Sequence, residues 1–189
     1  MFKELVLKNR SYRTFDESRP ITEEKMRALV DLARPVASGM NKQPLRYRIV
    51  AKQPELEKML ANTRYAGALS IKLPPEGQKP TGFIVIFNDT EVGSPDFLAF
   101  KDCGIAAQTI LLGATEMGFG GCMLASFDPA KLNGDLGVPA RYVPLLAIAL
   151  GTPAETVVVE DADEITAPYY RDERNVHHVP KRKLEDVLL

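Results

Sequence analysis

The fold is decided by the stretch Asp96-Phe-Leu-Ala-Phe-Lys-Asp-Cys-Gly-Ile-Ala-Ala-Gln-Thr-Ile-Leu-Leu-Gly-Ala-Thr-Glu-Met-Gly118. Small and apolar residues recur in it at helical spacing, and one row holds Phe100, Gly104, Ala107, Leu111 and Ala114. Ile105, Thr109 and Leu112 give a second face apolar character. A helix that is apolar on more than one face is usually central and closely packed. The pattern therefore predicts a long central helix over residues 96–118.

Shorter elements are expected on both sides of this helix. The periodicity predicts helices over 2–9, 23–33, 54–62 and 129–136, and strands over 46–51, 82–87, 122–125 and 143–150. Thr22 and Asp128 are expected N-caps, and Gly137 is expected to end the last of these helices. Beyond residue 153 the chain is polar and no element is predicted until residues 184–189. Helices and strands alternate without a strict βαβ rhythm, which indicates an α+β fold with a mixed sheet.

Composition bounds the class of protein. The 189 residues carry 24 Lys+Arg against 25 Asp+Glu, a formal charge of −1, which argues against a general nucleic-acid binder. The hydrophobic content of 45% is typical of a globular protein, and the length predicts one domain over residues 1–189. Charges interrupt the apolar N-terminal stretch, so we expect neither a signal peptide nor a membrane span there, and a cytoplasmic location by default.

Two polar segments are candidates for binding. Arg10-Ser-Tyr-Arg13 follows a helix end and offers two guanidiniums and a hydroxyl, which could clamp a phosphate, although such a cluster is more often a solvated turn. Ser38-Gly-Met-Asn-Lys-Gln-Pro44 offers amides and carboxamides to a heterocycle such as a flavin, or is a plain connection. Taken alone, neither sequence segment shows whether it binds a ligand or is only a turn or connection.

The remaining sequence segments give little indication of a phosphate, metal or disulfide site. Gly118-Phe-Gly-Gly121 follows a helix and precedes a strand, the reverse of a Rossmann phosphate loop. His177-His-Val-Pro-Lys-Arg-Lys183 is expected to be a solvated tail, and no metal site is predicted because adjacent histidines in a strand point to opposite faces. Cys103 and Cys122 are too few for a disulfide framework and are expected in the core.

Taken in order, these pieces resemble the nitroreductase family of FMN-dependent oxidoreductases. The matching segments are Arg10-Ser-Tyr-Arg-Thr-Phe15, Ser38-Gly-Met-Asn-Lys-Gln-Pro44, Asp102-Cys-Gly-Ile-Ala-Ala-Gln108 with Met117-Gly-Phe-Gly120, Phe127-Asp128, Leu136-Gly-Val-Pro139, Leu150-Gly-Thr-Pro153 and Pro180-Lys-Arg-Lys-Leu-Glu-Asp186. Asn9 and Ala37 depart from the family pattern, where arginine and proline are usual. The similarity covers nearly the whole chain.

The resemblance implies a nitroreductase-like fold that forms an interlocked homodimer, with FMN bound in clefts at the subunit interface. It implies that Arg10, Ser11 and Arg13 hold the phosphate and ribityl region, with Lys181 and Arg182 adding charge. It implies that Ala37, Ser38 and Gly39 pack near the flavin ring, and that Asn41 and Gln43 bond the ring or order their loop. Leu124, Ala125 and Ser126 would pass near flavin N5.

The implied activity is hydride transfer from NADH or NADPH to FMN, followed by reduction of a nitroaromatic, quinone or similar small acceptor in a ping-pong sequence. No residue of the protein is then needed as a catalytic group, because the flavin carries the chemistry. Three alternatives remain open at this point. They are a flavin-binding or carrier module without NAD(P)H turnover, a related flavoenzyme doing dehalogenation or flavin fragmentation, and an interaction domain without a cofactor.

Overall fold

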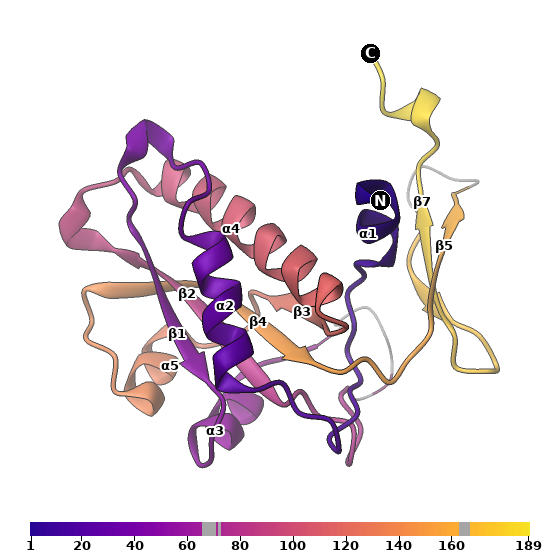
Figure 1. Ribbon diagram of the computed structural model, residues 1–189, viewed down its shortest axis with the longest axis horizontal. Coiled ribbons are helices and arrows are strands. Elements are labelled where there is room, and N and C mark those ends of the chain that lie inside the picture. The colour runs from indigo at the N-terminus through magenta and orange to yellow at the C-terminus, as the bar shows by residue number, and fades with distance from the viewer. Residues whose placement is uncertain (66–70, 72, 163–166) are drawn as a thin grey trace.

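The computed structural model describes residues 1–65, 71, 73–162 and 167–189. In this part of the chain the helices are α1 (Phe2–Lys8), α2 (Glu23–Ala33), α3 (Glu55–Asn62), α4 (Asp96–Glu116) and α5 (Pro129–Leu136), with 3-10 turns at η1 (Gly39–Asn41), η2 (Thr90–Val92) and η3 (Leu184–Asp186). The strands are β1 (Leu45–Val50), β2 (Gly82–Asp89), β3 (Gly120–Leu124), β4 (Tyr142–Gly151), β5 (Val157–Asp161), β6 (Tyr170–Arg171) and β7 (His177–Lys181). Figure 1 shows their arrangement.

The main sheet is antiparallel, with strand order β1-β2-β4-β3. Every residue of β2 is buried, because helices cover both faces of the sheet. Ile84 and Ile86 point into the core beneath α2 and α4, while Phe83, Val85 and Phe87 point into the second core beside α3 and α5. Full burial of each such side chain stabilises the fold by about 1.5–3 kcal/mol. The buried strand expected at 82–87 is confirmed.

The central helix α4 is also confirmed. It packs against α2 at Gly113, where an added Cβ would lie 2.7 Å from a methyl carbon of Leu32 and 3.0 Å from one of Leu29. Glycine therefore lets the two helices approach closely. By length and composition α4 could cross a membrane, but its buried residues pack against α2 and the sheet, which accounts for its apolar character.

One face of α4 differs from the prediction. Phe100 and Gly104 were expected on a packed face together with Ala107, but Phe100 is 61% exposed. Apart from the adjoining backbone of α4 itself, no atom of the described residues lies within 4 Å of a Cβ built on Gly104. Phe97 and Ile105 are exposed beside them. The buried stripe is rotated toward α2 and the sheet, so an apolar stripe of α4 faces outward in the single chain.

The helix boundaries follow the expected capping. Thr22 accepts a hydrogen bond from the amide of Lys25, and Asp128 accepts one from the amide of Lys131. Gly137 ends α5 in the left-handed region, with φ of 62°, a conformation that costs glycine little. The signals that begin and end these helices were thus readable in the sequence.

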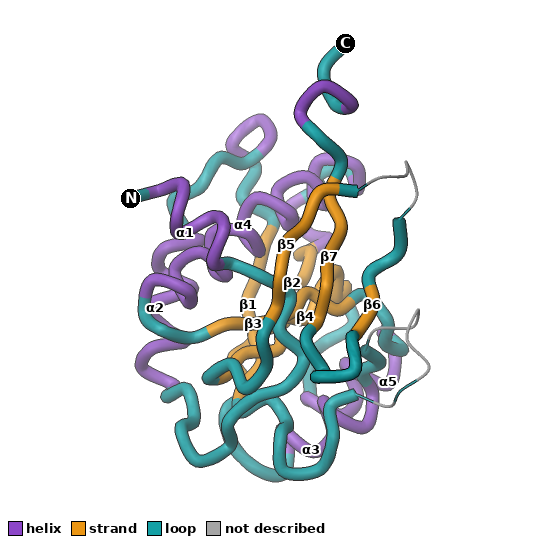
Figure 2. Tube along the Cα trace, turned by 90° about the vertical axis from the view of Figure 1, so that its right-hand side faces the viewer, coloured by secondary structure: helices purple, strands orange, loops and turns teal. Residues whose placement is uncertain are grey.

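The prediction of no regular element between residue 153 and residues 184–189 was wrong. It forms a second, small sheet with strand order β5-β7-β6, in which β5 and β7 are parallel (Figures 1 and 2). His177 was expected in a solvated tail, but only 1% of it is exposed. The strands are short, and β5 pairs with a strand about 20 residues later in the chain, so local periodicity carries little signal. Among the named strands of the described residues, β5 and β7 pair in parallel and the other pairs are antiparallel, so the α+β class with mixed, mostly antiparallel pairing is confirmed.

Candidate functional site

The segment Arg10–Arg13, here called the arginine loop, is held against the start of β3. The amide of Tyr12 donates to the carbonyl of Gly121 at 3.0 Å, and Ser11 pairs with Gly121 in an isolated parallel bridge. Glycine is needed at 121 because an added Cβ would lie 2.4 Å from the carbonyl oxygen of Ala149. The arginine loop is therefore a fixed part of the sheet edge and not a solvated turn.

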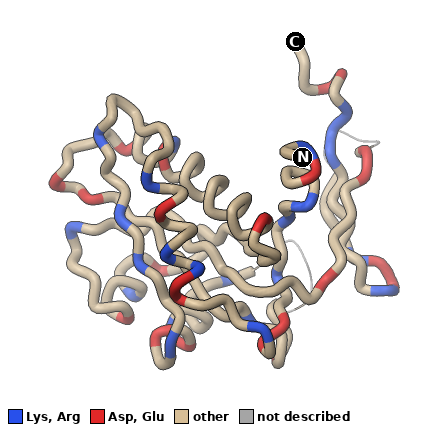
Figure 3. Tube along the Cα trace, viewed as in Figure 1, with Lys and Arg blue, Asp and Glu red and all other residues tan. Residues whose placement is uncertain are grey.

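A cavity of about 640 Å³ opens beside the arginine loop. Its wall brings together Arg10, Ser11 and Arg13 from the loop and Lys181 from the end of β7. The remaining lining residues come from α1, α4, β3 and the small sheet and are Phe2, Val6, Asn9, Gln108, Leu111, Leu112, Met123, Val157, Tyr169, His177 and Val179. Figure 3 shows the basic residues that gather after α1 and at the end of β7. Four predicted binding residues thus share one cavity.

The donor set of this cavity fits a phosphate. Among the described residues, Arg10 Nε, Arg13 Nε and His177 Nδ1 are buried without a hydrogen-bond partner. Burial, followed by the neighbouring charge of Arg13, lowers the pKa of His177, so the ring is neutral at neutral pH. Three cationic side chains from Arg10, Arg13 and Lys181 then line one wall, and guanidiniums bind phosphate oxygens through charge-assisted hydrogen bonds.

The second predicted segment, residues 37–43, is here called the ring loop. It is anchored by Asp102 of α4, a buried carboxylate that accepts a hydrogen bond from the Ser38 hydroxyl at 2.6 Å and from the Gly39 amide at 2.9 Å. The Ser38 hydroxyl oxygen in turn accepts from the amide of Gln43 at 2.9 Å, and the Gln43 carboxamide donates to the Asn41 side chain at 3.1 Å. Asn41 and Gln43 therefore order their own loop.

The ring loop carries unusual backbone geometry. Met40, Asn41 and Gln43 have φ values of 53°, 53° and 51°, in the left-handed region that residues other than glycine seldom adopt. Such conformations persist where surrounding contacts fix them, and they cluster at functional sites. Gln43 is tied to Ser38 and Asn41 by hydrogen bonds, and Ser38 is in turn bonded to Asp102.

The two loops do not meet within one chain. Ala37, Ser38 and Gln43 line a separate cavity of about 150 Å³, and that cavity shares no residue with the one beside the arginine loop. Figure 1 shows the two loops at opposite ends of α4. Asp102 contacts the ring loop while Leu111 contacts the other cavity, a separation of about 14 Å along the helix axis. Within the single chain, the arginine loop and the ring loop therefore face two different cavities.

The other predicted site residues lie as follows. Leu124 ends β3 and its side chain is buried in the core beside α5, while Ala125 and Ser126 follow it on the exposed surface. Met123 lines the cavity beside the arginine loop, whereas residues 124–126 do not. Arg182 follows Lys181 directly, outside the cavity lining. The roles assigned to these residues by resemblance stay predictions.

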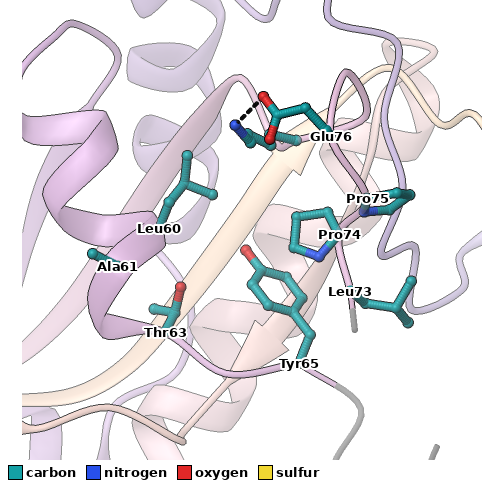
Figure 4. A pocket seen from close by; sticks show the side chains of 9 residues that line it. Leu60, Ala61, Thr63, Tyr65, Leu73, Pro74, Pro75 and Glu76 are labelled. Atoms are coloured by element: carbon teal, nitrogen blue, oxygen red, sulfur yellow. Dashed lines mark hydrogen bonds and ion pairs between the residues drawn. The ribbon is translucent and has the colours of Figure 1, made fainter. Parts of the chain in front are cut away.

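A second cavity of about 640 Å³ lies between α3 and the proline-rich segment before β2 (Figure 4). Leu60, Thr63, Tyr65, Pro74 and Glu76 are among the residues that line it. None of the predicted cofactor residues contributes to its wall. It is therefore not part of the candidate site.

Both cysteines lie in the core, as predicted. Cys103 and Cys122 are free and buried. Burial raises the pKa of the Cys103 thiol to about 12 and also raises the pKa of Cys122. Neither is a thiolate at neutral pH, so neither serves as a nucleophile.

Three residues around the site were missed at the sequence level. Asp102 stood inside the motif of the central helix, but no binding role was assigned to it. His177 was placed in a solvated tail. Nothing in the sequence indicated a role for Glu155, because a carboxylate that follows a strand-breaking Gly-Thr-Pro is typical of an exposed loop. In the structure its side chain is only 2% exposed.

Similarity to known proteins extends over most of the chain. The sequence profile of the nitroreductase family matches residues 6–91 and 77–152. A Streptococcus pyogenes protein, Spy0809, assigned by name as an NAD(P)H nitroreductase, is 28% identical over 199 residues, covering 90% of this chain and 94% of that protein.

Solved structures show the same fold. A Desulfovibrio desulfuricans protein that is assigned by name as a nitroreductase was solved in complex with FMN. It superposes with a TM-score of 0.74 at 24% identity, covering 99% of this chain and 94% of that one. A nitroreductase family protein of Streptococcus pneumoniae TIGR4 superposes with a TM-score of 0.69 at 18% identity and covers 100% of this chain and 99% of that one. With the profile match spanning well over half of its length, the chain belongs to the nitroreductase family.

Proposed function

We propose that the protein is an FMN-dependent oxidoreductase that takes reducing equivalents from NADH or NADPH and passes them to a small organic acceptor. The observation that carries this proposal is the cavity beside the arginine loop, where three cations and a neutral histidine surround space that suits a phosphate ester. Family membership and the names of its relatives support the same activity.

In this proposal the phosphate of FMN is bound by Arg10, Arg13 and Lys181, with Ser11 beside them. Leu111 and Met123 in the same wall exclude water from the ligand. The bound flavin would supply hydride acceptance at N5 and electron delivery to an acceptor such as a nitroaromatic or quinone. The protein's own contribution is to bind, orient and desolvate.

We further propose that the working unit is a homodimer, in which the ring loop of one chain completes the site of the other. The exposed apolar stripe of α4, with Phe97 and Phe100 more than half exposed, would be covered by the second copy. Exposed Phe2 on α1 would join the same interface. Asn41 and Gln43 would then offer amide groups to the ring edge of the flavin bound by the partner.

A cytoplasmic location is part of the proposal. NADH and NADPH are cytoplasmic reductants, and the free cysteines Cys103 and Cys122 suit a reducing compartment. Fractionation of cells that produce the protein, with detection by antibody, tests this. Recovery in a membrane or secreted fraction would contradict it.

The activity is tested with purified protein and added FMN. We expect a yellow protein whose flavin absorption is bleached by NADH or NADPH under anaerobic conditions and restored by a quinone. Protein that neither binds FMN nor oxidises NAD(P)H with FMN supplied would refute the proposal. Protein that binds FMN but is not reduced would instead be a flavin carrier, and stopped-flow measurement separates the two.

A further inference from the structure

A buried ion pair lies directly behind the arginine loop. Glu155, which lies between β4 and β5, has a side chain only 2% exposed, and that of Arg171 on β6 is 7% exposed. Arg171 donates to one carboxylate oxygen of Glu155. The other oxygen accepts from the backbone amides of Arg13 and Thr14, the latter at 3.0 Å. One carboxylate thus joins the arginine loop to the small sheet.

The same sheet contacts the Arg13 side chain from a second direction. Arg13 Nη1 lies 3.3 Å from His177 Nε2, and the guanidinium carbon lies 5.2 Å from the centre of the Tyr169 ring. Because arginine can only donate, His177 Nε2 is the acceptor. The backbone of Arg13 is therefore fixed by Glu155, while its side chain is aimed by His177 and Tyr169, residues of the β5–β7 region.

We propose that Glu155 is a positioning residue that sets the arginine loop for its ligand and couples docking of the small sheet to FMN binding. The inference rests on the proposed function, since Arg13 is its phosphate-binding residue. Glu155 does not line the cavity beside the arginine loop. It acts on that loop through the backbone amides of Arg13 and Thr14, and on the small sheet through its ion pair with Arg171. Because coupling between two binding events is reciprocal, bound FMN also stabilises the docked sheet.

The test is a double-mutant cycle on FMN affinity, followed by the fluorescence change of FMN on binding. Glu155→Gln keeps the side-chain shape but removes the charge that holds the two amides and Arg171, so we expect affinity to fall about tenfold. In an Arg13→Ala background the same change is expected to cost less than about twofold. Equal losses in both backgrounds would show a merely structural role and overturn the inference. Glu173→Gln, in an exposed turn of the same region, is the matched control.

A second readout is amide hydrogen exchange of residues 158–161 and 170–171, strand residues of the small sheet that do not line the cavity beside the arginine loop. FMN is expected to slow exchange there in the wild type and to have no such effect in Glu155→Gln. If Glu155→Gln does not fold, the paired change Glu155→Gln with Arg171→Met leaves no unpaired buried charge and carries the same expectation. Undiminished FMN affinity in the folded variant would refute the coupling.

The outcomes separate this inference from the proposed function. A wild-type chain that binds no FMN overturns both. A wild type that binds FMN while Glu155→Gln binds it equally well overturns only the positioning role.

Discussion

Asp102 is expected to be the anchor of the ring loop, and its replacement tests that role directly. Its buried carboxylate accepts two hydrogen bonds, from the Ser38 hydroxyl and the Gly39 amide. Asp102→Ala removes both, and Asp102→Asn retains the shape and one acceptor oxygen but loses the charge.

The size of the effect follows from these two contacts. A hydrogen bond to a charged group contributes about 1.5–3 kcal/mol, so the two contribute roughly 3–6 kcal/mol before the desolvation cost of the buried carboxylate is subtracted. We therefore expect Asp102→Ala to lower the free energy of unfolding by about 2–4 kcal/mol, and Asp102→Asn by about 1–2 kcal/mol. Folding survives, since domains are stable by about 5–15 kcal/mol.

Urea unfolding monitored by circular dichroism measures these differences. Glu116→Gln, an exposed change on the same helix, is the control and should shift the unfolding free energy by less than about 0.5 kcal/mol. FMN affinity should fall in both Asp102 variants, because the ring loop loses its fixation. If Asp102→Ala were as stable as the wild type within about 0.5 kcal/mol, the anchoring role would be refuted.

Three further changes have defined outcomes. Arg13→Ala should weaken FMN binding by about 1–3 kcal/mol in a fluorescence titration, whereas exposed Arg27→Ala should not; unchanged affinity would remove Arg13 from the phosphate site. The pKa of His178 is raised, chiefly by its hydrogen bond to Glu160. The free energy of unfolding of the wild type should therefore exceed that of His178→Gln by most from about pH 5 to 6.5, and this difference should shrink as pH rises through the raised pKa. A stability difference that stays constant from about pH 5 to about pH 8 in urea unfolding would contradict it. Gly121→Ala places a Cβ 2.4 Å from a backbone carbonyl oxygen of β4 and should cost about 1–3 kcal/mol in thermal unfolding, and a neutral result would argue against this packing.

Local signals in the sequence predicted the main layers of the fold. The helix over Asp96–Glu116, the buried strand over Gly82–Asp89 and the caps at Thr22 and Asp128 all depend on spacing or on nearby residues, which a sequence displays directly. The small sheet could not be predicted in this way. Its register pairs Val157 with His177, and such distant pairing is decided by tertiary packing.

For the candidate site too, the sequence predicted what local motifs display but not the contacts that tertiary packing creates. Motif order singled out Arg10, Arg13 and Lys181, and the structure brings them to one cavity. The carboxylates that hold the two loops, Asp102 and Glu155, became visible only through burial and hydrogen bonding. The resemblance also implied a site shared by two chains, and the separation of the two loops within one chain is the structural observation that supports it.

Mixing two defective chains tests this shared site most directly. One chain carries Arg10→Ala with Arg13→Ala, the other carries Asn41→Ala with Gln43→Ala, and each alone is expected to bind little FMN. After joint unfolding and refolding, random pairing makes half of the dimers mixed, and each mixed dimer has one site with both loops intact. If the site is shared by two chains, the mixture recovers about a quarter of the wild-type FMN-binding capacity. If each site were built within a single chain, no intact site would form, and an absence of recovery would contradict a site shared by two chains.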